Sequence, residues 1–580
     1  MIRKRYLSLV VALALFGIMA VVTAPAFSQA VVLTKKEGSQ FQYSTIQSAV
    51  NNALPGDTIV IPDGVWHERV YILNKGNSTD PITIMGTTRN GCIIDGGLNL
   101  ASATWIMETL NGQEFLVTTF THSLSTLAAW DADGTRIWTY GSAAEITDNT
   151  GGKPPEGVWY DRVNQKIYAK GFDPVVAGIT VSEYDNSVTI DKSTNIKLAN
   201  LTVKNGGASS LKITESTDIT VQNVNVKGGR HGITISNLAK TILSSRIRID
   251  GCNITETYNP EWWVSDFKSD TTAPMEGVGI WIVSAGDDNV VTNCEVTGFL
   301  HGISAQSDAD ENNVNNNLEI SYNRVHETAE GLGVDSVCFN CRVFSNTLYN
   351  VYTGISFSPA WGPLYVYRNV VINDRYIRFN RATTLYMYGL GLKIGWSARP
   401  SQDVNIYNNT FISGKTTVGC GMSTTNGVAK NFKFYNNIFY SKTIDVVHAS
   451  GAPEDGFFYD HNLYYSRTSS PLIIRWKKTL AGETNLFNSL VAAMVATSNS
   501  GADWEANGIN ADPMLKGLSE YPCNVSLLSG SPAIGKGKNI KQLGWPDSLN
   551  VEGGQYNIGA SQDNTVMAPS APTLLKVASF

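Results

Sequence analysis

Residues 318–357, LEISYNRVHETAEGLGVDSVCFNCRVFSNTLYNVYTGISF, decide the fold of this chain. Asn323 and Asn346 each precede a short apolar run, and Gly331 and Gly354 each open another, so both features recur after 23 residues (346 minus 323, 354 minus 331). A repeat of this length, made of short apolar runs and tight turns, predicts a solenoid with three strands in each coil.

The same pattern runs through residues 187–466. Further runs open with Gly232, Gly279, Gly302, Gly391 and Gly421, and further asparagines precede a run at Asn200, Asn223, Asn293, Asn369, Asn409, Asn437 and Asn462. Equivalent residues of stacked parallel strands lie about 4.8 Å apart, so the asparagines are expected to form a ladder of hydrogen-bonded amides. We assign them an architectural role.

The composition is that of a β-rich, turn-rich protein, because only 16% of the residues are charged and 52 of 580 are glycine. A formal net charge of -6 without a basic tract argues against nucleic acid as a partner. Seven cysteines are too few for a disulfide scaffold, and Cys338-x-x-Cys341 lacks the second pair of a zinc site. We expect buried thiols with at most one bridge.

Residues 1–30 resemble a secretory signal peptide. A basic start (Arg3–Arg5) precedes an apolar run (Leu7–Val22) and small residues suited to cleavage. A membrane anchor would need a longer apolar run, and no other stretch is long and apolar enough to span a bilayer. We therefore expect a secreted or periplasmic protein, not associated with a membrane and acting as a monomer.

The segment after the signal peptide predicts a helical cap and carries a family resemblance. Residues 45–54, TIQSAVNNAL, have one apolar helical face, and a solenoid needs a cap because its end exposes the core. AVNNALPGDTIVIPDGVW (49–66) and NKGNSTDPITIMG (74–86) resemble the opening of secreted right-handed parallel β-helix proteins of the pectin-lyase-like superfamily. The similarity is greatest to chondroitinase-B-like and alginate-lyase-like polysaccharide lyases, and beyond this opening only the coil pattern continues.

The resemblance and the repeat together imply an all-β fold: a right-handed parallel β-helix of three-strand coils with an asparagine ladder, an N-terminal capping helix and an inserted small β subdomain. The insertion is predicted from many aromatic residues and from hairpin-like pieces around Asp133-Gly134 and Asn164-Gln165. The expected divisions are a signal peptide (1–30), a cap with the first coils (31–97), the subdomain (98–185), central coils (186–466), C-terminal coils and cap (467–562) and a linker-like tail (563–580).

Insertions at the coil corners predict a groove. Residues 253–278 and 370–390 both fall between a third strand and the next first strand, and residues 308–317 leave the opposite edge. Function concentrates on such loops when a rigid scaffold holds them. Strand alternation places on the outward face of the first strands Trp281, Gln306, Asp335 and Lys393, with Arg399 just beyond.

The catalytic candidates belong to this face or its edge. His301 stands just before an opening glycine, and Glu330 takes that place in a later coil. A His–Glu pair is suited to acid–base catalysis, although a turn histidine can also be a hydrogen-bonded corner residue. The predicted catalytic set is Lys393, Arg399, Asp335, Glu330 and His301.

Substrate-binding candidates come from the same face and from the two long insertions. Arginines can hold an anionic sugar and aromatic rings can stack on sugar rings, while packing or solubility explains each residue equally well when taken singly. The predicted set is Trp262, Trp263, Trp281, Gln306, Arg375, Arg378, Arg381, Tyr386 and Tyr388.

Acidic turns follow two adjacent first strands. Counting along the strands pairs Asp287 with Asp310 and Asp288 with Glu311, and Asp308 lies beside them. Carboxylates stacked this closely repel one another unless a cation or a proton intervenes, so these five residues predict a calcium site. A solvated acidic turn is the alternative.

Three functions follow from these features. The resemblance implies a polysaccharide lyase that cleaves a uronate-containing polysaccharide by β-elimination, although the metal-ligand cluster and the Lys–Arg pair of the chondroitinase-B-like family have no counterpart that we can place. Paired carboxylates such as Asp335 with Glu330 or Glu276 instead suit a glycoside hydrolase. A non-catalytic carbohydrate-binding protein is the third.

Overall fold

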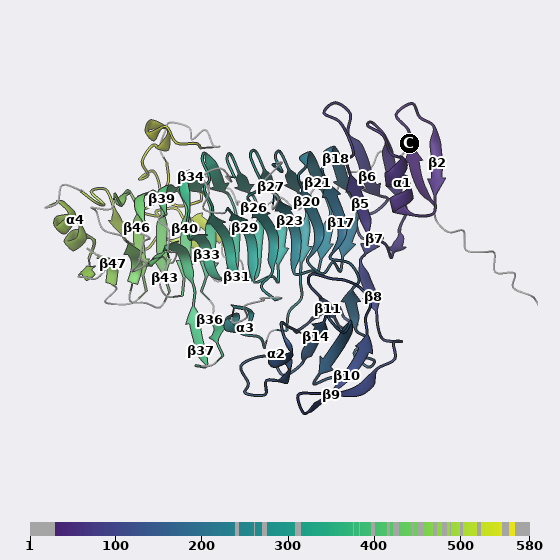
Figure 1. Ribbon diagram of the computed structural model, residues 1–580. Coiled ribbons are helices and arrows are strands. Elements are labelled where there is room, and N and C mark those ends of the chain that lie inside the picture. The colour runs from purple at the N-terminus through teal and green to yellow at the C-terminus, as the bar shows by residue number, and fades with distance from the viewer. Residues whose placement is uncertain are drawn as a thin grey trace, which may run out of the picture.

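The protein is described here by a computed structural model (Figure 1). It describes residues 30–562 except for 238–242, 260, 269–274, 308–314, 375, 382, 396–400, 415–417, 422–428, 443–445, 451–455, 468–471, 478–483, 488, 499–502, 519–523 and 548–555. No helix in these described residues is long and apolar enough to cross a membrane.

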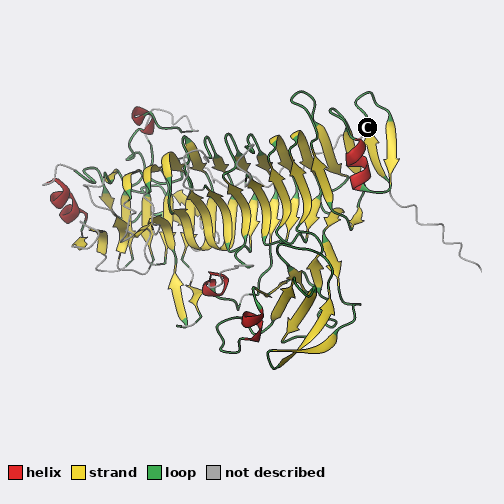
Figure 2. Ribbon diagram, viewed as in Figure 1, coloured by secondary structure: helices red, strands yellow, loops and turns green. Residues whose placement is uncertain are grey.

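Parallel coils stack into one long β-helix, as Figures 1 and 2 show. The second strands belong to a 14-stranded sheet, which is parallel from β3 onward. Its members are β2 (Gln40–Tyr43), β1 (Val31–Thr34), β3 (Thr58–Ile61), β6 (Ile82–Gly86), β18 (Thr194–Ala199), β21 (Thr217–Gln222), β24 (Arg248–Asp250), β27 (Val290–Thr292), β30 (Glu319–Ser321), β32 (Cys341–Phe344), β34 (Trp361–Tyr367), β39 (Gln402–Tyr407), β42 (Lys430–Tyr435) and β45 (Phe458–Asp460).

The first and third strands share a 24-stranded sheet, because β31 (Arg324–Asp335) and β33 (Thr347–Phe357) each run without a break from a third strand into the next first strand. The other first strands are β5 (Val70–Leu73), β17 (Asn186–Asp191), β20 (Ser209–Thr214), β23 (His231–Ser236), β26 (Val278–Val283), β29 (His301–Gln306), β38 (Leu390–Gly395), β41 (Val418–Gly421), β44 (Val446–Ser450) and β47 (Leu472–Lys477). The other third strands are β4 (Gly64–Trp66), β7 (Cys92–Asp95), β19 (Thr202–Lys204), β22 (Asn225–Lys227), β25 (Asn253–Thr255), β28 (Glu295–Thr297), β35 (Val370–Asn373), β40 (Thr410–Ser413), β43 (Ile438–Ser441), β46 (Leu463–Ser466) and β49 (Ile509–Asn510).

The opening glycines let the chain turn inward at the start of each first strand. A Cβ atom on Gly302 would lie 2.3 Å from Cγ1 of Val325 and 2.5 Å from the carbonyl oxygen of Gly331. No other residue fits there, because both contacts are shorter than any van der Waals separation. Gly421, by contrast, ends β41 instead of opening it.

The asparagine ladder is present and is shorter than the sequence pattern indicated. Six stacked side chains, each donating through Nδ2 to the Oδ1 of the next at 3.0 Å, form it: Asn323, Asn346, Asn369, Asn409, Asn437 and Asn462. The assignment of Asn200, Asn223 and Asn293 to the same column is wrong. They stand one residue earlier, at a corner with positive φ that Tyr322 occupies in the next coil, because this corner needs the left-handed conformation that asparagine tolerates.

A carboxylate ends the ladder. Nδ2 of Asn462 donates to Oε1 of the fully buried Glu505 at 2.7 Å, and the backbone N–H of Asn462 donates to Oε2 at 3.2 Å. The hydroxyl of Tyr464 also donates to Oε1, at 2.6 Å. An acceptor-only group is what the last amide of a column of donors requires.

The N-terminal cap is confirmed. Helix α1 (Ile46–Asn52) begins at Thr45, whose side chain accepts a hydrogen bond from the backbone of Ser48, and it buries Ile46, Ala49 and Val50. The C-terminal segment packs along the side of the later coils: Ala533 and Ile558 pack with third-strand residues, and Asp547 forms a buried ion pair with Arg368. The remaining C-terminal elements are β48 (Thr484–Phe487), α4 (Leu490–Ser498), β50 (Leu515–Gly517), β51 (Asn524–Leu527) and η2 (Ile540–Leu543).

The inserted β subdomain lies beside the β-helix (Figure 1). One sheet has five strands: β13 (Thr139–Tyr140), β14 (Gly157–Asp161), β15 (Lys166–Lys170), β10 (Gln113–Thr119) and β9 (Ile106–Leu110). A second has four: β12 (Arg136–Ile137), β11 (Ala129–Trp130), β16 (Thr180–Ser182) and β8 (Gly97–Asn99), and helix α2 (Ala143–Thr147) completes the unit. The antiparallel pairs β11–β12 and β14–β15 confirm both predicted hairpins.

We predict that Glu505→Gln destabilises the C-terminal end of the β-helix by about 1–3 kcal/mol, because the new NH₂ group meets an arriving donor from Asn462 or Tyr464. Urea unfolding measures the loss. Asp503→Asn is the matched control, since it makes the same carboxylate-to-amide change at an exposed position of the same loop. Equal stability of the two variants would contradict the role given to Glu505.

Candidate functional site

A row of charged side chains crosses the outward face of the first strands. Nδ1 of His301 lies 3.1 Å from Oε2 of Glu330, and its Nε2 lies 3.4 Å from Oε1 of Glu276. Nζ of Lys393 donates to Oε1 of Glu330 at 3.2 Å. We call Glu276, His301, Glu330 and Lys393 the charged cluster; its members come from the segment before β26 and from β29, β31 and β38.

Strand register builds the charged cluster. His301 on β29 pairs directly with Glu330 on β31, so two residues that precede an opening glycine are stacked. Lys393 occupies the column of Gly333 and Ser356. These small residues leave room for the long lysine side chain to reach back across the face to Glu330.

Asp335 lies on the same strand as Glu330 and in register with Gln306. Burial raises the pKa of Asp335 to about 7, and the nearby carboxylate of Glu330 adds to the increase. Lys393, a hydrogen bond of 2.6 Å from the backbone N–H of Ser358, and His301 oppose it. A carboxyl group in this environment can hold a proton near neutral pH and release it to a substrate.

The side chains of Trp281 and Gln306 extend the outward face of the first strands toward the N-terminal coils. Nε1 of Trp281 donates to Oε1 of Gln306 at 2.9 Å. The ring of Trp281 stacks on His231, with centroids 4.4 Å apart. His231 accepts a hydrogen bond from the backbone of Val278, and burial holds its pKa well below the ordinary value, so it is a neutral corner residue.

The predicted residues of the two long insertions lie elsewhere, where the insertions meet. Arg381 forms two hydrogen bonds of 2.7 and 2.6 Å with the buried carboxylate of Asp266. Arg378 pairs with Glu261 and lies over the ring of Trp263. These contacts join the hairpin β36 (Tyr376–Asn380) and β37 (Leu385–Tyr388) to helix α3 (Val264–Lys268).

Trp262, Trp263, Arg378 and Arg381 line a cleft of about 690 Å³ that the insertions form with the subdomain. Trp262 packs edge-on against Trp138 of the subdomain, with ring centroids 5.1 Å apart. The structure therefore divides the predicted substrate-binding residues between two places, the first-strand face and this cleft.

Several predicted residues lie outside the described residues. They are Arg375, Arg399, Asp308, Asp310 and Glu311, and for Tyr386 and Tyr388 only the strand is described. Their predicted roles stay predictions.

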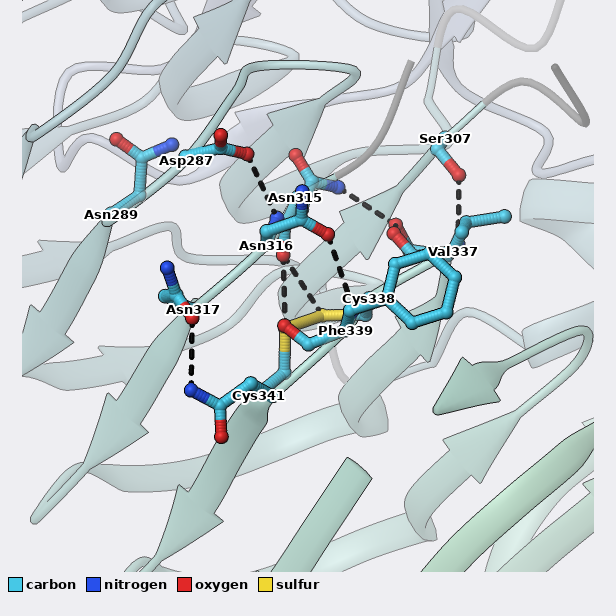
Figure 3. The surroundings of a disulfide bond; sticks show 12 residues. Asp287, Asn289, Ser307, Asn315, Asn316, Asn317, Val337, Cys338, Phe339 and Cys341 are labelled. Carbon is cyan, nitrogen blue, oxygen red and sulfur yellow. Dashed lines mark hydrogen bonds between the residues drawn. A yellow bond between two sulfur atoms is a disulfide. The ribbon is translucent and has the colours of Figure 1, made fainter. Parts of the chain in front are cut away.

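The acidic turn that was expected to bind calcium has a different register. The carboxylate of Asp287 accepts a hydrogen bond from the backbone N–H of Asn316, and that of Asp288 accepts one from the side chain of Asn317 (Figure 3 labels Asp287, Asn316 and Asn317). The expected pairing with Asp310 and Glu311 is wrong, because the register of β27 and β30 sets Asp287 and Asp288 opposite Asn316 and Asn317. Residues 308–314 lie outside the described residues. Among the described residues no group of three or more His, Cys, Asp or Glu could hold a metal ion, so the calcium site stays a prediction.

A disulfide bond lies beside this turn. Cys338 and Cys341 are joined, and their sulfur atoms lie 3.1 and 2.9 Å from the carbonyl oxygen of Asn315 (Figure 3). The expectation of one bridge agrees with this, and Cys92, Cys252 and Cys294 are buried thiols. The bridge closes the turn that precedes β32.

Two carboxylates of the first insertion, those of Glu276 and Glu256, lie in different places. Glu276 belongs to the charged cluster, and its sequence signal is its place in the first long insertion. Glu256 is buried against Arg136 and Trp130 of the subdomain, and burial raises its pKa to about 7. Arg136 was missed, because nothing in the local pattern shows which face of the subdomain docks on the β-helix.

Comparison with known proteins addresses the fold. The family model described as right handed beta helix region matches residues 186–371. No curated protein sequence matches the chain. Similar solved structures include XylC in complex with xylose (14% identity, 74% of this chain and 83% of that chain, TM-score 0.48) and pectate lyase Pel9A (12%, 89% and 90%, 0.40). A polygalacturonase from Erwinia carotovora ssp. carotovora is also similar (9%, 75% and 92%, 0.35).

At these identities the structural likeness concerns the fold alone. The family match, the parallel sheets and the asparagine ladder agree with one another over the central coils. Residues 186–371 match the right-handed beta helix model, and the chain folds as a parallel β-helix.

Proposed function

We propose that this protein is a carbohydrate-active enzyme that hydrolyses glycosidic bonds of a polysaccharide on its first-strand face. One observation carries the proposal: Asp335, whose pKa is raised to about 7, shares that face with Glu330, which His301 and Lys393 hold in place. Glycosidases use two carboxyl groups whose surroundings give them different pKa values, so that one acts as the acid and the other as the base.

In this scheme Asp335 is the general acid and Glu330 the general base. Asp335 donates its proton to the glycosidic oxygen as the bond from that oxygen to the anomeric carbon breaks. Glu330 takes a proton from a water molecule, whose oxygen forms the new bond to the anomeric carbon. His301 and Lys393 are positioning residues, because both act through hydrogen bonds to Glu330. Trp281 supplies an aromatic surface for a sugar ring on the same face.

A polysaccharide lyase acting on a uronate polymer is the second candidate, and the contacts of Lys393 and His301 with the same carboxylate, that of Glu330, favour it. β-Elimination needs a cation for the uronate carboxylate and a base for the C5 proton. However, Lys393, Arg378 and Arg381 all bind carboxylates of the protein itself. A lyase would therefore depend on Arg375 or Arg399 for its cation.

One assay on a panel of neutral and uronate polysaccharides separates these functions. New reducing ends without ultraviolet absorbance of an unsaturated uronate would support hydrolysis. Reducing ends together with that absorbance would support the lyase and refute the hydrolase. Binding without either signal would support the third expectation, a non-catalytic carbohydrate-binding protein. Export, which residues 1–30 predict, would bring the protein to such polymers.

We predict that Asp335→Asn lowers kcat by about 10²–10⁴-fold, the usual contribution of a general acid. Because the acid must carry its proton, kcat/KM of the unmodified enzyme should fall as the pH rises through about 7. Asp403→Asn, on the second-strand sheet, is the matched control and should retain activity. A pH profile that stays flat between pH 6 and about 8.5 would exclude Asp335 as the acid.

Lys393→Met should move the alkaline limb of the same profile to higher pH. The charge of Lys393 lowers the pKa of Asp335, so its removal raises that pKa further. The measurement is kcat/KM against pH for both proteins, with the thermal midpoint as a check on folding. A shift to lower pH would contradict this electrostatic coupling.

A further inference from the structure

One fully buried asparagine, Asn315, joins the ends of three neighbouring first strands. Its Oδ1 accepts a hydrogen bond of 3.0 Å from the backbone N–H of Ala285, which follows β26. Its Nδ2 donates to the carbonyl oxygen of Gln306, the last residue of β29, at 3.3 Å and to the hydroxyl of Ser336, which follows β31, at 2.8 Å. The side chain of Asn315 therefore connects the strand that ends at Asp335 to the two strands before it.

The disulfide bond between Cys338 and Cys341 holds the backbone of the same asparagine. The backbone N–H of Asn315 donates to the carbonyl oxygen of Val337 at 3.1 Å. Both sulfur atoms of the bridge lie against the carbonyl oxygen of Asn315, as Figure 3 shows. Asn315 is thus fixed through its side chain and its backbone together, and we call Asn315 and the Cys338–Cys341 bridge the bracket.

The bracket contacts the residue that directly follows Asp335 in the chain. That residue is Ser336, whose hydroxyl accepts from Asn315 and donates to the carbonyl oxygen of Val337 at 3.0 Å. The carboxylate of Asp335 in turn accepts a hydrogen bond of 2.6 Å from the backbone N–H of Ser358. A displacement of about 1 Å at a reacting group can lower a rate about 10²-fold, so contacts that fix the end of this strand can control catalysis.

We propose that Asn315 is a positioning residue for Asp335 and that the Cys338–Cys341 bridge keeps Asn315 in place. The inference rests on the proposed function, in which Asp335 is the general acid. Because Asn315 is fully buried, it touches no substrate and acts through Ser336. Loss of the bracket lets the end of β31 move, so that water reaches the carboxyl group of Asp335 and its hydrogen bond from the backbone is weakened.

Asn315→Ala tests the proposal, and Asn289→Ala is its matched control. Asn289 is equally buried and its side chain also makes three hydrogen bonds, which join it to Ile247, Ser244 and Gly286. None of these three residues is a hydrogen-bond partner of Asn315. Both substitutions remove a buried amide, so both should lower the thermal midpoint, and activity is compared at a temperature well below either midpoint.

Asn315→Ala should lower kcat/KM by up to about 10²-fold and move the alkaline limb of its pH profile to lower pH. The direction follows because burial raises the pKa of Asp335, so a carboxyl group that gains contact with water loses its proton at lower pH. Asn289→Ala should keep the limb of the parent protein. Cys338→Ala combined with Cys341→Ala should move the limb as Asn315→Ala does, and it guards against a folding defect because the bridge closes only a short loop.

Hydrogen–deuterium exchange at the amide of Ser358 gives a second readout that needs no activity. Exchange should be faster in Asn315→Ala and in the double cysteine variant than in the parent protein and in Asn289→Ala, because this amide loses its carboxylate acceptor. Unchanged exchange in either variant, an equal increase in Asn289→Ala, or an alkaline limb that does not move would overturn the proposal. If the parent protein cleaves no polysaccharide, the proposed function fails, and the exchange measurement alone still decides whether Asn315 positions Asp335.

Discussion

Parallel pairing in register is the constraint on which the rest of the structure depends. It sets each residue of one coil directly against its equivalent in the next, so a residue type repeated at one position becomes a column. The same rule produces a ladder from Asn323 to Asn462 and stacks His301 on Glu330. Architecture and candidate chemistry therefore have one geometric origin. The ladder lies at the corner between second and third strands, and the charged cluster lies on the first-strand face.

The first-strand face can hold charge because its scaffold is rigid and its small residues leave space. Ser356 lies on the strand between Lys393 and Glu330, and Gly333 lies on the strand of Glu330 itself. Larger side chains at either position would block the contact of Lys393 with Glu330. The charged residues of the insertions have a different role. Arg378 and Arg381 are paired with carboxylates and link the two insertions to each other. Arg136 of the subdomain links it to the β-helix through Glu256. The charged cluster and the cleft therefore lie in separate places on the molecule.

The sequence predicted the features that depend on a short repeating pattern of residues. The coils, the capping helix, both hairpins of the subdomain and the outward positions of Trp281, Gln306, Asp335 and Lys393 follow from alternation and repeat length alone. It failed where the count along the strands had to cross an insertion: Asp287 faces Asn316 instead of Asp310, because strand register sets the partner and the length of an insertion cannot be read from the period. The subdomain docks through Arg136 and Glu256, which are 120 residues apart in the sequence. No pattern within either segment predicts such a contact.

The end of the asparagine ladder has a consequence for how such a chain can gain or lose coils during evolution. Each asparagine amide donates a hydrogen bond to the next asparagine toward the C-terminus, so the column has a direction. Only its last member needs a different partner. Glu505 supplies that partner from the segment just before β49, the last third strand. Coils between Asn323 and Asn462 could therefore be duplicated or lost as whole units during evolution, because every new asparagine would find the acceptor of the next and the same terminal carboxylate would still close the series.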